Sequence, residues 1–160
     1  MKFDFVTIGG ATEDITFYTK EGVLIDNKQD ILRQKLLAFE YGAKIKIDRS
    51  YSTFGGGAAN ASVCLSFLGF NVAALIAVGE DNRGKRVATN LKNNKVNTSF
   101  VQENKNDQSG FSFLLVGPGN EHIVFSDRAS NKNLSISKKE INLLNHTKWV
   151  CLCFPSSYQR

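Results

Sequence analysis

Three consecutive glycines stand directly before an asparagine in the stretch TFGGGAANAS, residues 53–62. Bare backbone at Gly56 and Gly57 would let a hydroxyl-rich ligand reach main-chain N–H groups, and the Asn60 carboxamide offers both a donor and an acceptor. The alternative interpretation is a tight turn that packs a strand closely against a helix. The spacing is neither G-x-G-x-x-G nor G-x-x-x-x-G-K-[ST], so neither a dinucleotide fingerprint nor a Walker-type loop is present here.

The elements that must position these residues alternate between strand and helix signals, which is typical of an α/β fold with a largely parallel sheet. The run FDFVTIGG from Phe3 is rich in β-formers and is stopped by Gly9 and Gly10, so the first strand should end in a tight turn. An N-cap at Asp81 and the capping box in SKKE predict two helices. The other expected elements are a helix over 58–68, a buried strand over 72–79, a strand near 99–102, an antiparallel hairpin around GPGN and a last buried strand from Trp149. Because the chain stops soon after it, we expect this last strand to be left as an exposed edge or unpaired on one side.

The segment 19–51 fits this alternation least well. Helix formers in DILRQKLLAFE predict a helix over 30–40, whereas AKIKIDRSYSTF alternates over 43–54 as a half-exposed strand does. We therefore expect an excursion from the main sheet that carries at least one strand.

Composition limits the class of protein. A chain of 160 residues with 42% hydrophobic content can bury one core and has the size of a single domain. The net charge is +5, but the lysines are scattered among acidic residues, so we expect no nucleic-acid partner. The apolar run from Val72 is shorter than the roughly 20 residues that cross a bilayer, and the N-terminus lacks the features of a signal peptide. We expect a cytoplasmic protein with no membrane partner.

The three cysteines, Cys64, Cys151 and Cys153, all lie in apolar segments. Their odd number and setting favour buried free thiols over a disulfide framework. The C-x-C pair has only His122 and His146 as further soft ligands, so we expect no structural zinc site and no bound metal.

The glycine-rich stretch resembles the first signature of the ribokinase-like, or PfkB, family of carbohydrate and nucleoside kinases. That signature begins with Gly-Gly and a small residue. An Asn follows two positions after the small residue, a Ser, Thr or Ala two positions after the Asn, and two glycines stand further along the chain. The positions that match it here are Gly56, Gly57, Ala58, Asn60, Ser62, Gly69 and Gly79.

Three more segments resemble this family, in the family's order along the chain. IGGATEDI resembles the motif at the end of the first strand whose Asp binds substrate hydroxyls, and that Asp is Asp14 here. VGEDNRG is similar to the family's V-G-x-D-x-x-G. The pair SGFSF and HIVF, followed by RASN, resembles a strand pair that begins Thr-Gly and ends Gly-Ala-Asn, with Ser109 and Ser130 departing from it.

The resemblance implies a ribokinase-like three-layer α/β/α core with a mostly parallel sheet and a small β-sheet lid, incomplete at the C-terminus. Residues 1–160 would form the substrate-binding N-terminal half, with lid segments at about 15–54 and 110–127. The substrate-binding residues implied are Asp14, Gly56, Gly57, Asn60 and Asn131.

The resemblance also implies ATP and Mg²⁺ as cofactors, with their sites mostly absent from this chain. The family's D-T-x-G-A-G-D segment, which carries the catalytic base, does not occur in the sequence, so we expect no catalytic residue before Arg160. The lid of many family members forms a subunit interface, which implies a possible homodimer through the lid.

Three functions are weighed on these grounds. The first is a kinase that phosphorylates a hydroxyl of a sugar or nucleoside, present here as a part that lacks catalysis by itself. The second is a non-catalytic sugar-binding or lid-mediated dimerisation module. The third is a nucleotide-dependent oxidoreductase, but GGATED after the first strand fails the dinucleotide fingerprint that it requires.

Overall fold

The computed structural model describes residues 3–153, which separate into two compact units. The core unit contains the residues up to Glu13, Phe54–Phe111 and the residues from Ser126 onward. The extension unit contains Asp14–Thr53 and Ser112–Phe125. The two segments of the extension unit overlap the predicted lid segments, and their action as a lid stays a prediction.

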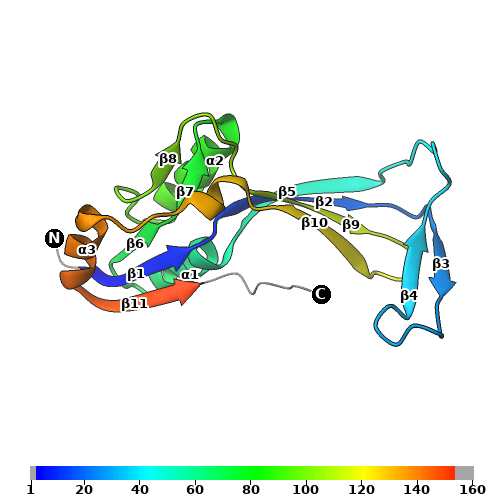
Figure 1. The fold of residues 1–160 in the computed structure, drawn as a ribbon, viewed down its shortest axis with the longest axis horizontal. Coiled ribbons are helices and arrows are strands. Elements are labelled where there is room, and N and C mark those ends of the chain that lie inside the picture. Colours follow the sequence, from blue (N-terminus) through cyan, green and yellow to red (C-terminus); the bar gives the residue numbers. More distant parts are fainter. Residues whose placement is uncertain (1–2, 154–160) are drawn as a thin grey trace. The chain divides into compact units, whose positions relative to one another are not determined.

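A parallel sheet forms the centre of the core unit (Figure 1). Its strand order is β11-β1-β6, with β1 spanning Phe3–Gly9, β6 Val72–Leu75 and β11 Thr147–Cys153. Strand β1 pairs in parallel with both neighbours, and Gly9 lies opposite Cys153 at the carboxyl end. A second parallel pair joins β7 (Ala77–Gly79) to β8 (Gln102–Asn104). The first strand ends at Gly9 as predicted, whereas the strand expected over 72–79 is interrupted at Ile76.

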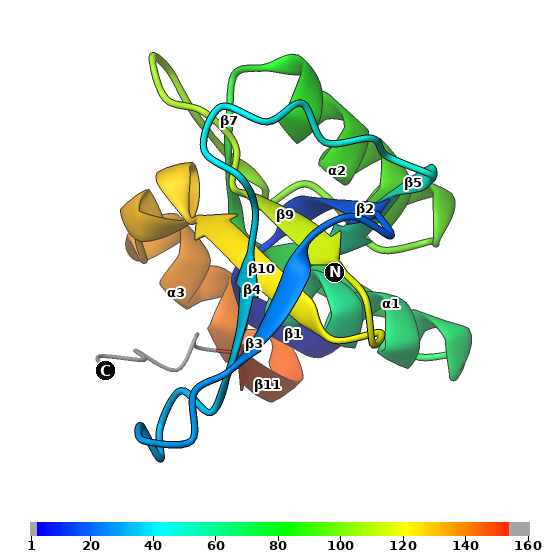
Figure 2. The ribbon, with the colours of Figure 1, turned by 90° about the vertical axis from the view of Figure 1, so that its right-hand side faces the viewer.

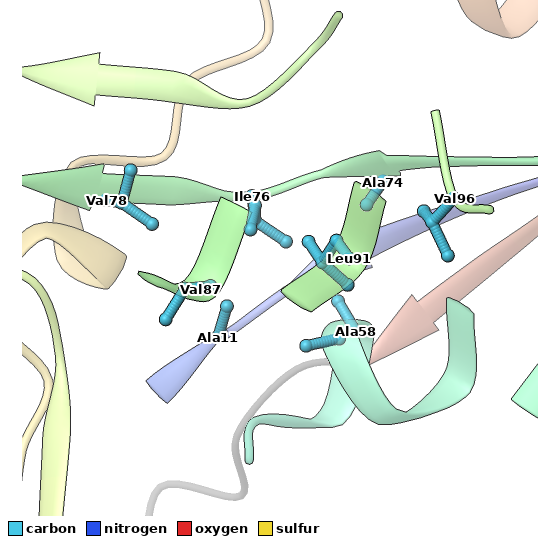
Figure 3. Close-up of a cluster of buried hydrophobic side chains, with 9 residues drawn as sticks. Ala11, Ala58, Ala74, Ile76, Val78, Val87, Leu91 and Val96 are labelled. Carbon is cyan, nitrogen blue, oxygen red and sulfur yellow. The ribbon is translucent and has the colours of Figure 1, made fainter. Parts of the chain in front are cut away.

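Helices cover both faces of this sheet, which confirms the three-layer α/β/α core. On one face, α1 (Gly57–Phe67) and α2 (Asn82–Asn93) pack with Ala74 and Ile76 in a buried cluster (Figure 3). On the other face lies α3 (Lys138–Asn145) (Figure 2). Its Leu143 joins a second buried cluster. Alternate side chains of β6 divide between the two clusters, as a strand buried on both faces requires. Among residues 3–153, no helix has both the length and the apolar character needed to cross a bilayer.

The helix starts follow their capping residues. The Asp81 carboxylate accepts a hydrogen bond of 2.7 Å from the N–H of Gly84 and begins α2. Ser137 and Glu140 form a reciprocal capping box at the start of α3. Both predicted N-termini are confirmed, because side-chain caps are local features that satisfy donors the helix leaves open.

Four strands form a sheet that continues through the extension unit, in the order β10-β9-β2-β5. Their bounds are β2 Thr12–Tyr18, β5 Arg49–Gly55, β9 Phe111–Val116 and β10 His122–Asp127. The ring of Phe113 lies 4.9 Å from that of Phe17 and 5.6 Å from that of Phe125, so aromatic contacts link three of these strands. The hairpin around GPGN is confirmed as β9 and β10.

The helix predicted over 30–40 is wrong. Residues Lys35–Ala38 form β4, which pairs antiparallel with β3 (Val23–Asp26). The Asp30 carboxylate accepts from the N–H of Leu32 at 2.9 Å, which turns the chain between the two strands. The pairing with β3 therefore overrides the helix propensity of the segment. The strand predicted over 43–54 begins later, at Arg49.

The expected burial of Cys64 is wrong, whereas the exposed edge expected at the last strand is confirmed. Cys64 is exposed on α1, so it does not behave as a core residue. Strand β11 lies at the edge of the three-stranded sheet, and 66% of the Trp149 surface and 57% of the Leu152 surface are exposed. An apolar run identifies a strand, but it does not show whether both faces of that strand are covered.

Leu91→Ala tests the core that positions α1 and α2. Leu91 is fully buried in the first cluster (Figure 3), so its truncation should lower the free energy of unfolding by about 2–5 kcal/mol. Lys92→Ala, one residue along α2 and exposed, is the control and should change stability by less than about 0.5 kcal/mol. Urea unfolding measures both, and similar losses for the two variants would contradict the assigned packing.

Candidate functional site

The carboxyl ends of β1 and β11 lie beside the start of α1 in the core unit. A Cβ atom placed on Gly57 would lie 3.0 Å from the Cβ of Cys153, so the helix begins close to the end of β11. Open α/β sheets bind their ligands outside the carboxyl ends of the strands. This edge is therefore the candidate site.

The first turn of α1 is capped by main chain. The carbonyl oxygen of Gly10 accepts from the N–H groups of Ala58, at 3.1 Å, and Ala59, at 3.4 Å. The helix has no side-chain cap, so this carbonyl satisfies donors that the helix leaves open. The N–H groups of Ala58 and Ala59 are therefore used within the protein, and the predicted contact of a ligand with the main chain of Gly56 and Gly57 stays a prediction.

Gly56 allows this close approach. Its φ is 91°, a conformation that side-chain-bearing residues rarely adopt. An added Cβ would lie 2.5 Å from the Cα of Ala11 and against the carbonyl oxygen of Gly10. The tight-turn interpretation is confirmed for Gly56, and a contact of its main chain with a ligand stays a prediction.

Asn131 holds the segment that follows β1. It lies in the 3-10 helix η1 (Ala129–Asn133), and its Oδ1 accepts from the N–H of Ala11 while its Nδ2 donates to the carbonyl of Ala11, both at 2.9 Å. A carboxamide has one further N–H and one further lone pair beyond these bonds. Asn131 thus has a structural role, and its contact with substrate remains a prediction.

Asn60 and Asp14 lie in different units. Asn60 is the fourth residue of α1 and is exposed in the core unit, and its carboxamide has no hydrogen-bond partner among residues 3–153. Asp14 is the third residue of β2, is half-buried, and belongs to the extension unit. The placement of Asp14 at the end of the first strand is therefore wrong, because β1 stops at Gly9 and a new strand begins at Thr12. A shared ligand of Asn60 and Asp14 stays a prediction.

Asp81 links α2 to the segment before β9. Its carboxylate accepts from the N–H of Ser109 at 2.9 Å and from the Ser109 hydroxyl at 2.7 Å, in addition to the N–H of Gly84. Burial alone would raise the pKa of Asp81, but the hydrogen bonds from Ser109 and Gly84 outweigh it and hold the pKa below its ordinary value. Asp81 is therefore an ionised structural residue at neutral pH, in agreement with its prediction as an N-cap.

Cys153 of β11 is a poor nucleophile. Its sulfur atom lies 3.6 Å from that of Cys151, and burial, followed by the hydrogen bond with Cys151, raises the pKa of Cys153 to about 11. Because the thiolate is the reactive form, Cys153 is unreactive at neutral pH.

Residues 3–153 contain no cluster of three or more His, Cys, Asp or Glu side chains that could hold a metal ion. The Mg²⁺ implied by the resemblance stays a prediction, because Mg²⁺ is usually held by only one or two carboxylates together with substrate phosphates.

Two features were not predicted from the sequence. One is the cap that the Gly10 carbonyl provides, although the Gly-Gly pair at the strand end was a local signal for a close approach. The other is the buried carboxylate of Glu13, which pairs with Arg83 and Arg86 of α2. A single sequence does not indicate that two residues 70 positions apart will form an ion pair.

Comparison with known proteins identifies relatives of the chain. Residues 25–153 match the family described as pfkB family carbohydrate kinase. The chain is 30% identical to a ribokinase of Dictyostelium discoideum over 94 residues, covering 56% of the chain and 30% of the relative. It is 33% identical to a ribokinase of Bacillus subtilis over 70 residues, covering 44% of the chain and 24% of the relative. The chain thus spans less than a third of the length of these relatives.

Solved structures show the same fold. The Arabidopsis thaliana ribokinase complexed with ribose and ATP superposes with a TM-score of 0.80 at 19% identity, covering 97% of this chain and 47% of the other. A nucleoside kinase of Methanocaldococcus jannaschii gives a TM-score of 0.64 at 24% identity, covering 82% and 39% of the two chains. The ribokinase-like fold is therefore established for this chain.

Gly56→Ala tests the contact between Gly10 and α1. Gly69 has a similar φ of 88° but open space where a Cβ would stand, so Gly69→Ala is a matched control that introduces only backbone strain. We expect Gly56→Ala to lower the free energy of unfolding by about 1–3 kcal/mol more than Gly69→Ala does, because it adds a collision with the backbone. Urea unfolding measures the difference, and equal losses would show that α1 does not depend on this approach.

Proposed function

The chain belongs to the pfkB family of carbohydrate kinases, and on this premise we propose that it serves the ATP-dependent phosphorylation of a hydroxyl of a sugar or nucleoside. The family match over residues 25–153 carries this proposal. The superposition with a ribokinase that holds ribose and ATP supports it at the level of the fold. A cytoplasmic location belongs to the same proposal.

The chain supplies the sugar-binding part of this activity. The Asp14 carboxylate accepts hydrogen bonds from substrate hydroxyls, and such bonds to a charged group are stronger than those between neutral groups. The exposed Asn60 carboxamide adds a donor and an acceptor. Main chain at Gly56 and Gly57 and the remaining hydrogen-bonding capacity of Asn131 complete the set.

We assign no catalytic residue to this chain. The sequence contains no D-T-x-G-A-G-D segment, and residues 3–153 hold no metal-binding cluster. We propose that the base, most of the ATP site and the Mg²⁺ ligands of the activity are supplied by residues other than these. Bound ATP would supply the phosphoryl group, while the residues named above bind and orient the acceptor hydroxyl.

The second candidate is a non-catalytic sugar-binding module that uses the same sugar-binding residues. Both functions require sugar binding at Asp14, and they differ in turnover. The module binds sugar without consuming ATP, whereas the kinase forms a sugar phosphate.

A homodimer through the extension unit is part of the proposal. Its strands β3 and β10 expose apolar side chains, with 66% of Val23, 45% of Ile25 and 55% of Phe125 accessible. Strand β3 pairs with β4, and β10 belongs to the four-stranded sheet, so these exposed side chains come from two sheets of the extension unit. Exposed apolar patches of this kind mark interaction surfaces. A second copy of the chain is the partner that the family resemblance implies.

Asp14→Asn tests sugar binding. Removing the charge while keeping the shape should weaken the binding of ribose by about 10- to 100-fold, because a hydrogen bond to a charged group contributes about 1.5–3 kcal/mol. Asp26→Asn, an exposed carboxylate of β3 in the same unit, should bind like the wild type. Isothermal titration with ribose and adenosine measures affinity. An assay for ADP release separates the kinase from the binding module when it is run on a protein that also carries the proposed base and ATP site, because this chain alone binds sugar without turnover in both cases. Unchanged affinity in Asp14→Asn would refute the assignment of Asp14.

Ile25→Lys tests the homodimer. A charge in the centre of an apolar interface should raise the dimer dissociation constant about tenfold or more, because the ammonium must be desolvated. Leu68→Lys, at an apolar position of the core unit that is more exposed than Ile25 (68% against 45%), should leave the dimer intact. Analytical ultracentrifugation measures the masses, and a wild type that remains monomeric at high micromolar concentration would contradict the dimer.

A further inference from the structure

Glu13 is a buried charge held by two arginines of α2. Only 4% of its surface is accessible. Its two carboxylate oxygens accept from Arg86, with Oε1 2.8 Å from Nε and Oε2 2.6 Å from Nη2, while Nε of Arg83 lies 3.3 Å from Oε2. Two parallel bonds to one guanidinium fix the carboxylate in direction as well as in position. All three residues belong to the core unit.

One of these arginines, Arg83, also reaches β9, the strand next to β2. The Arg83 guanidinium stacks over the ring of Phe111, 4.4 Å from its centre, at the first residue of β9. The N–H of Glu13 donates to the carbonyl of Gly110 at 3.2 Å. Glu13, Arg83, Arg86, Gly110 and Phe111 thus form one connected group, which we call the α2 clamp.

The position of the clamp in the chain gives it a consequence for the proposed site. Glu13 is the last residue of the core unit before Asp14, the first residue of the extension unit. Successive side chains of a strand point to opposite faces, so holding Glu13 against α2 directs Asp14 to the other face of β2. A slip of one residue would exchange the two carboxylates between the faces.

We propose that Glu13, held by Arg83 and Arg86, is a positioning residue that fixes the register and rigidity of the start of β2 and so presents Asp14 to its ligand. The proposal rests on the proposed function for the role of Asp14, but the clamp itself can be tested without a ligand. Two equally charged neighbours in sequence have different tasks: Glu13 holds the backbone, and Asp14 meets the substrate.

The nature of the pairing explains why the clamp is specific. A buried carboxylate without partners is strongly unfavourable, so the strand is stable only in the register that brings Glu13 to the arginines. Arg86 offers two N–H groups in a rigid fork, which a lysine cannot reproduce. An apolar residue at position 13 would pack in more than one register, whereas the ion pair selects one.

Glu13→Gln removes the charge at nearly constant volume and is compared with Glu140→Gln. Glu140 is a matched control because it is equally buried, at 5% accessible, and hydrogen-bonded in the core unit, but it caps α3. Hydrogen exchange without ligand should be about tenfold faster at residues 10–16 and 109–113 in Glu13→Gln, and unchanged there in Glu140→Gln. Over residues 138–145, hydrogen exchange should be faster in Glu140→Gln and unchanged in Glu13→Gln.

The second measurement is the affinity for ribose by isothermal titration. Glu13→Gln should weaken binding about tenfold, whereas Glu140→Gln, although destabilised, should bind like the wild type. Arg86→Lys keeps the positive charge but loses the planar guanidinium that donates two parallel hydrogen bonds. It should speed hydrogen exchange at residues 10–16 and weaken ribose binding, each to a smaller extent than Glu13→Gln does. It serves as the test if Glu13→Gln does not fold.

The outcomes separate this inference from the proposed function. Unchanged exchange at residues 10–16 in Glu13→Gln and Arg86→Lys overturns the clamp. Faster exchange with unchanged ribose affinity overturns the positioning of Asp14. A wild type that binds neither ribose nor adenosine overturns the proposed function, and the exchange data then decide the clamp alone.

Discussion

The close contact between the Gly10 carbonyl and the first turn of α1 is the constraint on which the candidate site depends. It closes the helix end with main chain in place of a side chain, and it brings α1 to the carboxyl end of β1. Each hydrogen bond contributes only about 0.5–1.5 kcal/mol. The close approach of the backbones sets a stricter limit, because it leaves no room for a side chain at position 56. A side chain at position 56 would occupy the space of Gly10 and Ala11. The glycine motif is therefore first a packing device, and any ligand must use the backbone that this packing leaves accessible.

Charged and polar side chains then attach distant segments to this edge. Asn131 binds both main-chain polar groups of Ala11, and Asp81 binds both donors of Ser109. Glu13 forms the third attachment, to α2. Each anchor satisfies groups that would otherwise be buried without partners, which is why its loss costs more than one exposed hydrogen bond. These anchors surround the point where the chain passes from the core unit to the extension unit.

Local signals predicted most of the core unit. Gly9 ends β1, Asp81 begins α2, and Ser137 with Glu140 begins α3, because glycine ends and side-chain caps act within a few residues of themselves. The family motifs gave the layer order, which the structure confirms. Prediction failed over 30–40, where β4 owes its form to pairing with β3, and at Cys64, whose apolar neighbours did not imply burial. In both cases the outcome depended on how distant parts of the chain pack, which the local sequence pattern does not show.

The sequence by itself determined the family, most elements of the core unit and the residue types available to bind a hydroxyl-rich ligand. Only the tertiary structure decided which of those residues already form hydrogen bonds or ion pairs within the protein. Asn131 meets Ala11 across 120 positions and Glu13 meets Arg86 across 73, and no local preference records such pairs. The reason is physical: helix caps and strand alternation depend on neighbours in the chain, whereas a buried ion pair or carboxamide bridge depends on how separate layers pack.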